Sequence, residues 1–174
     1  GYWSGIRLEQ LVRRGEVPPG AVEMAVIGLD GHGDSFRLDY AFGPDAFFAL
    51  GMNGETLSRN HGFPIRMLSP RYYGFKSIKW IDRIDFVSQP YFGTWPKMGY
   101  TKEPVIHVGA YVDKVKRSEG KLEAGGIAYS GAGEIAEVWL RQLDEEKRPL
   151  EEWVKARLEK PLARHTFTRW RHST

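Results

Sequence analysis

The sequence predicts an α+β protein of two domains, a mixed α/β domain followed by a β-rich domain. Apolar residues at helical spacing occur near the N-terminus, at Leu8, Leu11 and Val12, and they predict a helix. Short apolar or alternating runs between glycine, proline and asparagine predict strands along most of the remaining chain. An aromatic, proline- and glycine-rich stretch at 91–104 separates domains expected at 1–90 and 105–174.

Composition excludes several classes of partner and site. The 174 residues carry 25 Lys and Arg against 22 Asp and Glu, with the signs interspersed, so the formal charge is only +3. That balance favours no nucleic-acid partner, and no apolar window reaches the length of a membrane helix, so no membrane partner is expected. The chain has no cysteine, which excludes disulfides, thiolate metal ligands and a thiol nucleophile within it.

The first domain is expected to begin with a short amphipathic helix that ends near Gly15, after two arginines in its last turn. The pair Asn53-Gly54 is the strongest hairpin signal in the chain. Strands are expected at 22–29, 35–40, 46–52, 65–69 and 77–87. The loop at 30–34 combines two carboxylates with a histidine. It is either a solvated loop whose aspartates cap their own backbone or a binding loop at a strand end.

Residues 61–79 form the stretch that carries the most chemistry. An imidazole, two guanidinium groups, two ammonium groups, two tyrosines and turn-forming glycines occur together there. Arginine offers a planar fork for phosphate and lysine a mobile charge. A solvated basic surface is the alternative, but interspersed apolar residues such as Ile65, Met67 and Ile78 indicate a half-buried segment, and half-buried cations require an anionic partner. The stretch therefore predicts a site for an anion with a flat ring attached.

The second domain is expected to be a small β-sandwich. Strands are expected at 105–114, 121–130, 135–143, 153–158 and 166–171, with a turn at 131–133. The segment 145–158 is rich in glutamate and lysine, and a helix there is the alternative.

Residues 53–84, NGETLSRNHGFPIRMLSPRYYGFKSIKWIDRI, resemble the sulfite oxidase family of molybdenum-cofactor enzymes in the order and spacing of their motifs. The start Trp3-Ser4-Gly5 and the small-residue turn at 124–133 resemble further parts of that family. The resemblance implies a sulfite-oxidase-type molybdopterin-binding domain, then a partial immunoglobulin-like β-sandwich that mediates dimer contacts. It also implies a chain truncated at both ends, either a fragment or a naturally shortened protein.

The resemblance implies molybdopterin as the cofactor, with six residues that bind it: Asp30, His61, Arg66, Ser77, Ile78 and Lys79. Tyr100 matches the family's catalytic tyrosine beside the substrate, while an aromatic in a packed loop is the alternative role. Gly99 stands before it where family members often carry a carboxylate. No metal ligand is assigned, because the family's molybdenum-binding cysteine has no counterpart in this chain.

The function that the resemblance implies is oxidation of sulfite or a related small oxo-substrate, with electrons passed to a separate cytochrome. A homodimer and a periplasmic location are expected from the same resemblance. A second hypothesis is a non-catalytic member that serves as a cofactor-binding or assembly subunit. A third treats the basic and aromatic residues 71–80 as a nucleic-acid surface, which the balanced charge elsewhere in the chain opposes.

Overall fold

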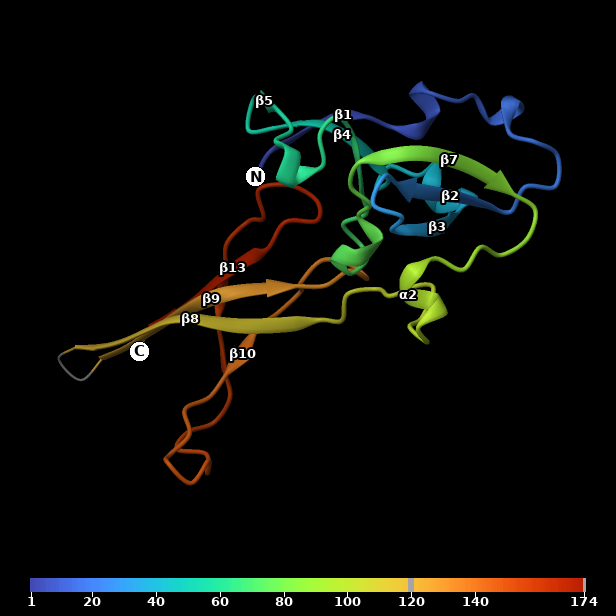
Figure 1. The fold of residues 1–174 in the computed structure, drawn as a ribbon. Coiled ribbons are helices and arrows are strands. Elements are labelled where there is room, and N and C mark those ends of the chain that lie inside the picture. The colour runs from blue at the N-terminus through green and yellow to red at the C-terminus, as the bar shows by residue number, and fades with distance from the viewer. Residues whose placement is uncertain (119–120, 174) are drawn as a thin grey trace. The chain divides into compact units, whose positions relative to one another are not determined.

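The computed structural model describes residues 1–118 and 121–173, and the chain divides into two compact units, residues 1–105 and 106–174 (Figure 1). Strands dominate the described part of both units, and the two α-helices found there, α1 (Leu38–Ala41) and α2 (Thr94–Lys97), are single turns. The expected mixture of helix and strand is therefore shifted strongly towards strand. Within the described residues, no helix is long and apolar enough to cross a membrane.

The first unit contains two antiparallel sheets. In one sheet, β4 (Phe47–Met52) pairs with β1 (Trp3–Ile6), β5 (Glu55–Thr56) and β6 (Arg66–Leu68). In the other, β2 (Glu23–Gly28) lies between β3 (Gly33–Arg37) and β7 (Ile81–Val87), as Figure 1 shows. The hairpin expected at Asn53-Gly54 is confirmed: both residues have positive φ, 56° and 85°, and they connect β4 to β5 as in a two-residue turn.

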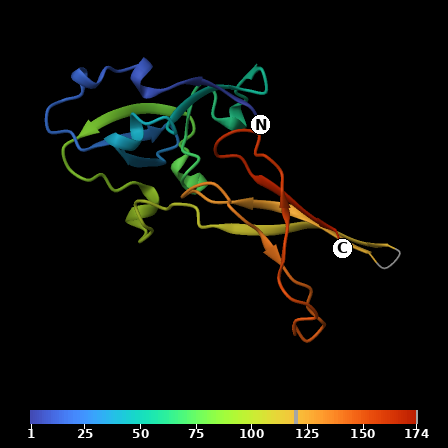
Figure 2. The same cartoon turned by 180° about the vertical axis from the view of Figure 1, so that it is seen from behind.

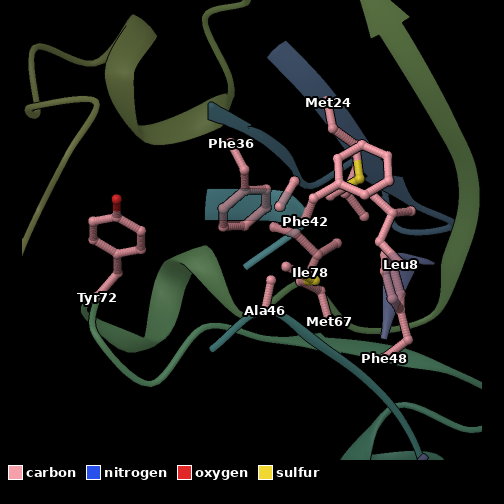
Figure 3. Packing of buried hydrophobic residues seen from close by; sticks show 11 residues of the cluster. Leu8, Met24, Phe36, Phe42, Ala46, Phe48, Met67, Tyr72 and Ile78 are labelled. Atoms are coloured by element: carbon pink, nitrogen blue, oxygen red, sulfur yellow. The ribbon is translucent and has the colours of Figure 1, made fainter. Parts of the chain in front are cut away.

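The core of the first unit is formed by side chains from both sheets and from the connections between them. Figure 3 shows Leu8, Phe48 and Met67 packed close to one another, and Tyr72 at the margin of the group. Leu8, Phe48 and Met67 are all fully buried. The cluster consists of Leu8, Met24, Val26, Phe36, Ala41, Phe42, Ala46, Phe48, Met67, Tyr72 and Ile78.

The prediction of a helix near the N-terminus is wrong. Residues Trp3–Ile6 form β1 instead, and short 3-10 turns follow at η1 (Leu8–Gln10) and η2 (Arg14–Glu16). Pairing with β4 places residues 3–6 in a strand, and the apolar residues at helical spacing, Leu8, Leu11 and Val12, lie in and directly after the 3-10 turn η1. Gly5 permits this pairing, because a Cβ there would lie 2.0 Å from the carbonyl oxygen of Phe48.

Two expected strands are shorter than predicted. The segment expected at 35–40 is a strand only as far as Arg37, and α1 begins at the next residue, Leu38. The segment expected at 77–87 becomes a strand at Ile81. Trp80, with a φ of 51°, interrupts the extended conformation immediately before it. The irregular residues 77–80 follow the 3-10 turn η4 (Gly74–Lys76) and belong to the site described below.

The segment 91–104, expected as a linker, lies within the first unit and contains α2. The backbone N–H of Tyr91 donates to Glu23, and the Lys102 ammonium group binds both carboxylate oxygens of Glu23 at 2.7 and 2.9 Å. The N–H of Gly33 donates to the Thr94 hydroxyl. These bonds hold the segment against β2 and β3.

The second unit has one four-stranded sheet and one two-stranded ribbon. Figure 2 shows the long strands of this sheet from behind. The sheet order is β12 (Arg157–Leu158), β13 (Thr168–Ser173), β9 (Lys121–Tyr129) and β8 (Gly109–Ser118), and the ribbon pairs β10 (Trp139–Leu140) with β11 (Val154–Lys155). Trp170 is its largest buried side chain and packs with Ala128, Val138 and Ala156.

Strands form in the second unit near most of the expected positions, but their lengths differ from those predicted. The strand expected at 135–143 is regular only at Trp139–Leu140, and the one expected at 153–158 is split into β11 and β12. The alternative helix at 145–158 is absent from this described segment. Asp144 accepts hydrogen bonds from the backbone and side chain of Arg148, and these bonds favour a turn between β10 and β11.

Candidate cofactor-binding site

A short turn, η3 (Arg59–His61), is held against the strand β6 and the segment 77–80. It ends at Gly62, which has a φ of 102°. A Cβ at Gly62 would lie 3.0 Å from the Cβ of Arg66 and 3.1 Å from the Cβ of Lys79. Glycine is required both by the left-handed backbone and by this close approach. The turn therefore places His61 beside two cations.

The Arg66 side chain is the half-buried cation of this group. Its Nη1 donates to the carbonyl of His61 and its Nη2 to the carbonyl of Ser77, both at 3.2 Å. Its Nε is buried and has no hydrogen-bond partner within the described residues. Burial lowers the pKa of Arg66, because desolvation disfavours the charged form. A carboxylate does not pair with Arg66 in the described part of the chain, so an anionic ligand would supply the missing charge.

Aromatic rings lie against both cations. The guanidinium carbon of Arg66 lies 5.3 Å from the centre of the Trp3 ring, and the His61 ring meets Trp3 edge-on at 6.4 Å. The Lys79 ammonium nitrogen lies 5.1 Å from the centre of the Trp80 ring. Such contacts orient a cation without neutralising its charge. The site thus combines positive charge with flat apolar surfaces.

Three hydrogen bonds fasten the turn that carries His61. Lys79 Nζ donates to the carbonyl of Asn60 at 2.8 Å, and Trp80 Nε1 donates to the carbonyl of Arg59 at 2.8 Å. The Ser58 hydroxyl is 2.7 Å from Nδ1 of His61. His61 is exposed. The contact with Ser58 engages Nδ1 and orients the ring, which leaves Nε2 as the nitrogen that can contact a ligand.

Asp30 follows β2 and lies next to the same segment. The N–H of Leu29 donates to the carbonyl of Trp80 at 2.9 Å. A Cβ at Gly28 would lie 2.5 Å from the carbonyl oxygen of Lys79, so glycine lets the two backbones touch. The exposed Asp30 carboxylate accepts from the N–H of His32 through Oδ1. A carboxylate in this place can accept further bonds from a ring's amino edge.

Ser77 and Ile78 serve the protein's own structure in this conformation. The Ser77 carbonyl accepts from Arg66, and its hydroxyl bonds to Ser69. Ile78 is fully buried in the core, and its carbonyl accepts from the N–H of Met67. These two residues therefore orient Arg66 and anchor the segment between the two sheets.

Tyr100 lies in a separate aromatic group. Its ring packs against Trp95 at 5.1 Å and against Phe75 at 6.2 Å, measured between ring centres. The residue is 54% exposed. Phe75 connects this group to the site, because it lies two residues before Ser77 and its carbonyl bonds to Nε2 of His32.

The structure places six of the seven expected residues on adjoining segments, together with supporting residues that the sequence did not indicate. These supporting residues are Trp3, Ser58, Asn60, His32 and the buried pair Asp34 and Lys76. The Trp-x-Gly start was a signal for Trp3. Nothing in the sequence indicated that Asp34 and Lys76 are buried, since charged residues normally face solvent.

The residues present suit a ligand with a phosphate and a ring that carries amino groups. Arg66, Lys79 and His61 can bind a phosphate. The buried Nε of Arg66 has no hydrogen-bond acceptor among the described residues, and a ligand could provide one. Asp30 can accept hydrogen bonds from amino groups of the ring. Residues 1–118 and 121–173 contain no group of three or more His, Cys, Asp or Glu side chains that could hold a metal ion. The site therefore fits the organic part of a cofactor.

Comparison with known proteins agrees with this chemistry. Residues 1–95 match the family model described as "Oxidoreductase molybdopterin binding domain". The chain is 31% identical over 166 residues to the mitochondrial sulfite oxidase of Drosophila melanogaster, covering 75% of this chain and 29% of that protein. It is 38% identical over 94 residues to a protein-methionine-sulfoxide reductase catalytic subunit of Gluconobacter oxydans, covering 53% and 30% respectively.

A solved structure shares the fold. The sulfane dehydrogenase SoxCD of Paracoccus pantotrophus superimposes with a TM-score of 0.75 at 23% identity, over 98% of this chain and 47% of that chain. At this identity the likeness concerns the fold alone. The chain spans less than a third of the two relatives named above and about half of this structure.

Proposed function

Because the chain belongs to the sulfite oxidase family of molybdopterin-binding oxidoreductases and its cofactor is molybdopterin, we propose that it oxidises sulfite or a related small oxo-substrate. The observation that carries the proposal is the half-buried Arg66, which has an orphaned Nε and no carboxylate partner among the described residues. Arg66 would bind the cofactor's phosphate together with His61 and Lys79. When bound, the cofactor supplies two-electron redox chemistry.

The remaining expected residues would bind the pterin, orient Arg66 or contact the substrate. Asp30 would accept hydrogen bonds from the pterin's amino edge, and Ser77 and Ile78 would orient Arg66 and the adjoining backbone. Tyr100, an exposed residue, would act as the catalytic residue, with its hydroxyl donating to an oxygen of the anionic substrate. A phenol is suited to this role because its O–H can donate one hydrogen bond.

The partners and the location are proposals of the same kind. Electrons would leave to a separate cytochrome, and the family resemblance supports a periplasmic location. The second unit would be part of an immunoglobulin-like β-sandwich that forms a homodimer. Exposed apolar side chains support such an interface, since large apolar surfaces are usually covered by a partner. In the second unit they include Val108, Tyr111, Val112, Val115, Trp153, Leu162 and Phe167.

Cofactor analysis is the direct test of the proposal. Protein isolated from cells should release a fluorescent oxidised pterin on acid treatment and contain molybdenum, and it should reduce cytochrome c when sulfite is added. The same preparation should be assayed for reduction of methionine sulfoxide, because a relative at 38% identity carries that activity in its name. Reduction of the sulfoxide without sulfite oxidation would reject sulfite as the substrate and keep the cofactor assignment.

A second candidate is a non-catalytic member that binds the cofactor or assists assembly. It is favoured by the absence of cysteine from these 174 residues, since the family binds molybdenum through a thiolate and no residue here can supply one. This candidate predicts pterin without molybdenum, or neither, and no sulfite-dependent electron transfer. Molybdenum at one atom per chain together with turnover would exclude it.

A further inference from the structure

A buried ion pair lies between β3 and the turn η4. The Lys76 ammonium nitrogen is 3.0 Å from Oδ1 of Asp34, and the two side chains are 3% and 0% exposed. Nζ also donates to the carbonyls of Ser35 and Lys102. An ammonium group has three hydrogens to donate, so these acceptors use all of them.

The pair is an unusual way to stabilise a core. Removing two charges from water is costly, and apolar side chains of similar volume often stabilise a fold equally well. The pair is also incompletely satisfied, because Oδ2 of Asp34 is buried and lacks a partner among the described residues. Its geometry therefore calls for an explanation other than stability.

The acceptors of Lys76 show which segments it joins. Asp34 and Ser35 belong to β3, whereas Lys102 belongs to the segment 91–104 that carries Tyr100. Lys76 itself ends η4 and is followed directly by residues 77–79. One side chain thus links the segment that orients Arg66 to the segment that carries Tyr100.

The neighbour of Lys76 makes the same link through ring contacts. Phe75, in the same turn, packs against both Trp95 and Tyr100. The hydrogen bond from Lys76 to the Lys102 carbonyl holds the segment two residues beyond Tyr100. Tyr100 is therefore held between a ring contact from one residue of η4 and a hydrogen bond from the next.

We propose that Lys76, oriented by Asp34, is a positioning residue that holds the segment carrying Tyr100 in a fixed position relative to residues 77–79. The proposal rests on the proposed function for the catalytic role of Tyr100, but the contacts that it concerns are within the chain. Without the Lys76 bond, the carbonyl of Lys102 loses its buried donor. The segment keeps its hydrogen bonds with Glu23, Ser35, Gly33 and Tyr73 and its ring contacts with Phe75.

The test compares Lys76→Met, the double variant Asp34→Asn with Lys76→Met, and Asp34→Asn alone. The double variant removes the ion pair without leaving a buried unpaired charge, so it folds even where Lys76→Met does not. Asp34→Asn keeps the Lys76 bond to Lys102 and loses only the charge of its partner. Arg83→Ala, which removes an exposed ion pair with Asp85, is the control.

Hydrogen exchange followed by mass spectrometry measures the effect in peptides covering 94–104 and 46–52. We expect exchange in 94–104 to accelerate about tenfold or more in the double variant, which corresponds to about 1.4 kcal/mol, and less in Asp34→Asn. Peptide 46–52, from β4, should exchange as in the parent and in Arg83→Ala. Unchanged exchange in 94–104, or equal acceleration in both peptides, would overturn the positioning role.

Pterin content measured on the same samples separates this proposal from the proposed function. A parent protein without pterin would contradict the function, while selective exchange in 94–104 would still support Lys76 as the residue that holds this segment. A parent with pterin and without selective exchange in the variants would leave the function standing and reject the positioning role.

Discussion

The guanidinium carbon of Arg66 lies 5.3 Å from the centre of the Trp3 ring, although the two residues lie far apart in the sequence. The pairing of β1 with β4, and of β4 with β6, brings them together. The ring limits the orientations open to the guanidinium, while two backbone carbonyls fix its Nη atoms. The fork of Arg66 is therefore held in place before any ligand binds.

Replacing Arg66 should weaken pterin binding. A charge-assisted hydrogen bond contributes roughly 1.5–3 kcal/mol, so Arg66→Ala should lower the affinity for the pterin about 10- to 100-fold. Arg66→Lys should recover little, because a point charge cannot replace a planar fork. Fluorescence of oxidised pterin per mole of purified protein measures the loss. Arg83→Ala, on the exposed surface of β7, is the control, and equal pterin content in all these proteins would reject the phosphate role.

Gly62→Ala should disturb the site more than the same change at another left-handed glycine. Its Cβ would press against Arg66 and Lys79 at 3.0 and 3.1 Å, and the backbone strain adds about 1–3 kcal/mol. Gly54→Ala is the matched control, because Gly54 also has positive φ but open space around it. Both variants should lower the thermal unfolding midpoint, whereas only Gly62→Ala should lose pterin. Equal pterin content in the two variants would show that the close approach at Gly62 is unimportant.

Tyr100→Phe should reduce turnover and leave the cofactor content unchanged. The ring can keep its contacts with Phe75 and Trp95, so only the hydroxyl donor is lost. Loss of one general acid or hydrogen-bond donor lowers kcat by roughly 10²–10⁴. Sulfite-dependent cytochrome c reduction and pterin fluorescence measure the two quantities, with Tyr111→Phe in the second unit as the control. A loss of pterin in Tyr100→Phe would assign the residue a structural role.

The bond between Glu23 and Lys102 predicts a specific acid sensitivity. Burial raises the pKa of Glu23, but hydrogen bonds from Lys102 and from the Tyr91 N–H lower it more, so the net pKa lies below 4.5. A carboxyl group with a depressed folded pKa stabilises the fold at pH values above its unfolded pKa. That stabilisation is lost as the pH falls below 4.5 and through the lower pKa that Glu23 has in the folded protein.

Urea unfolding at neutral pH and at several pH values below 4.5 checks this prediction. The parent should lose more free energy of unfolding across this range than Glu23→Gln, which has no carboxylate to protonate. Lys102→Met should also show a smaller loss, because its Glu23 has no ammonium partner. Parallel pH profiles for the parent and Glu23→Gln would show that the pair contributes nothing to acid stability.

The sequence by itself determined the local signals. Asn53-Gly54 specified its hairpin because both positions take positive φ readily, and the apolar run before Asp30 specified β2. The mixture of cations and aromatic residues in 61–79 predicted a site for an anion, and the spaced motifs of 53–84 indicated the family that the family model confirms. These features depend on residues near one another in the chain, so the sequence predicts them without knowledge of the fold.

Only the tertiary structure decided how these residues are used. Pairing with β4 made residues 3–6 a strand where the sequence predicted the start of a helix, because strand pairing across the sheet outweighs local propensity. Lys76 and Lys79 look alike in the sequence, but Lys79 reaches the turn with His61 whereas Lys76 is buried on Asp34. The burial of a side chain depends on segments distant in the chain, and local pattern contains no information about them.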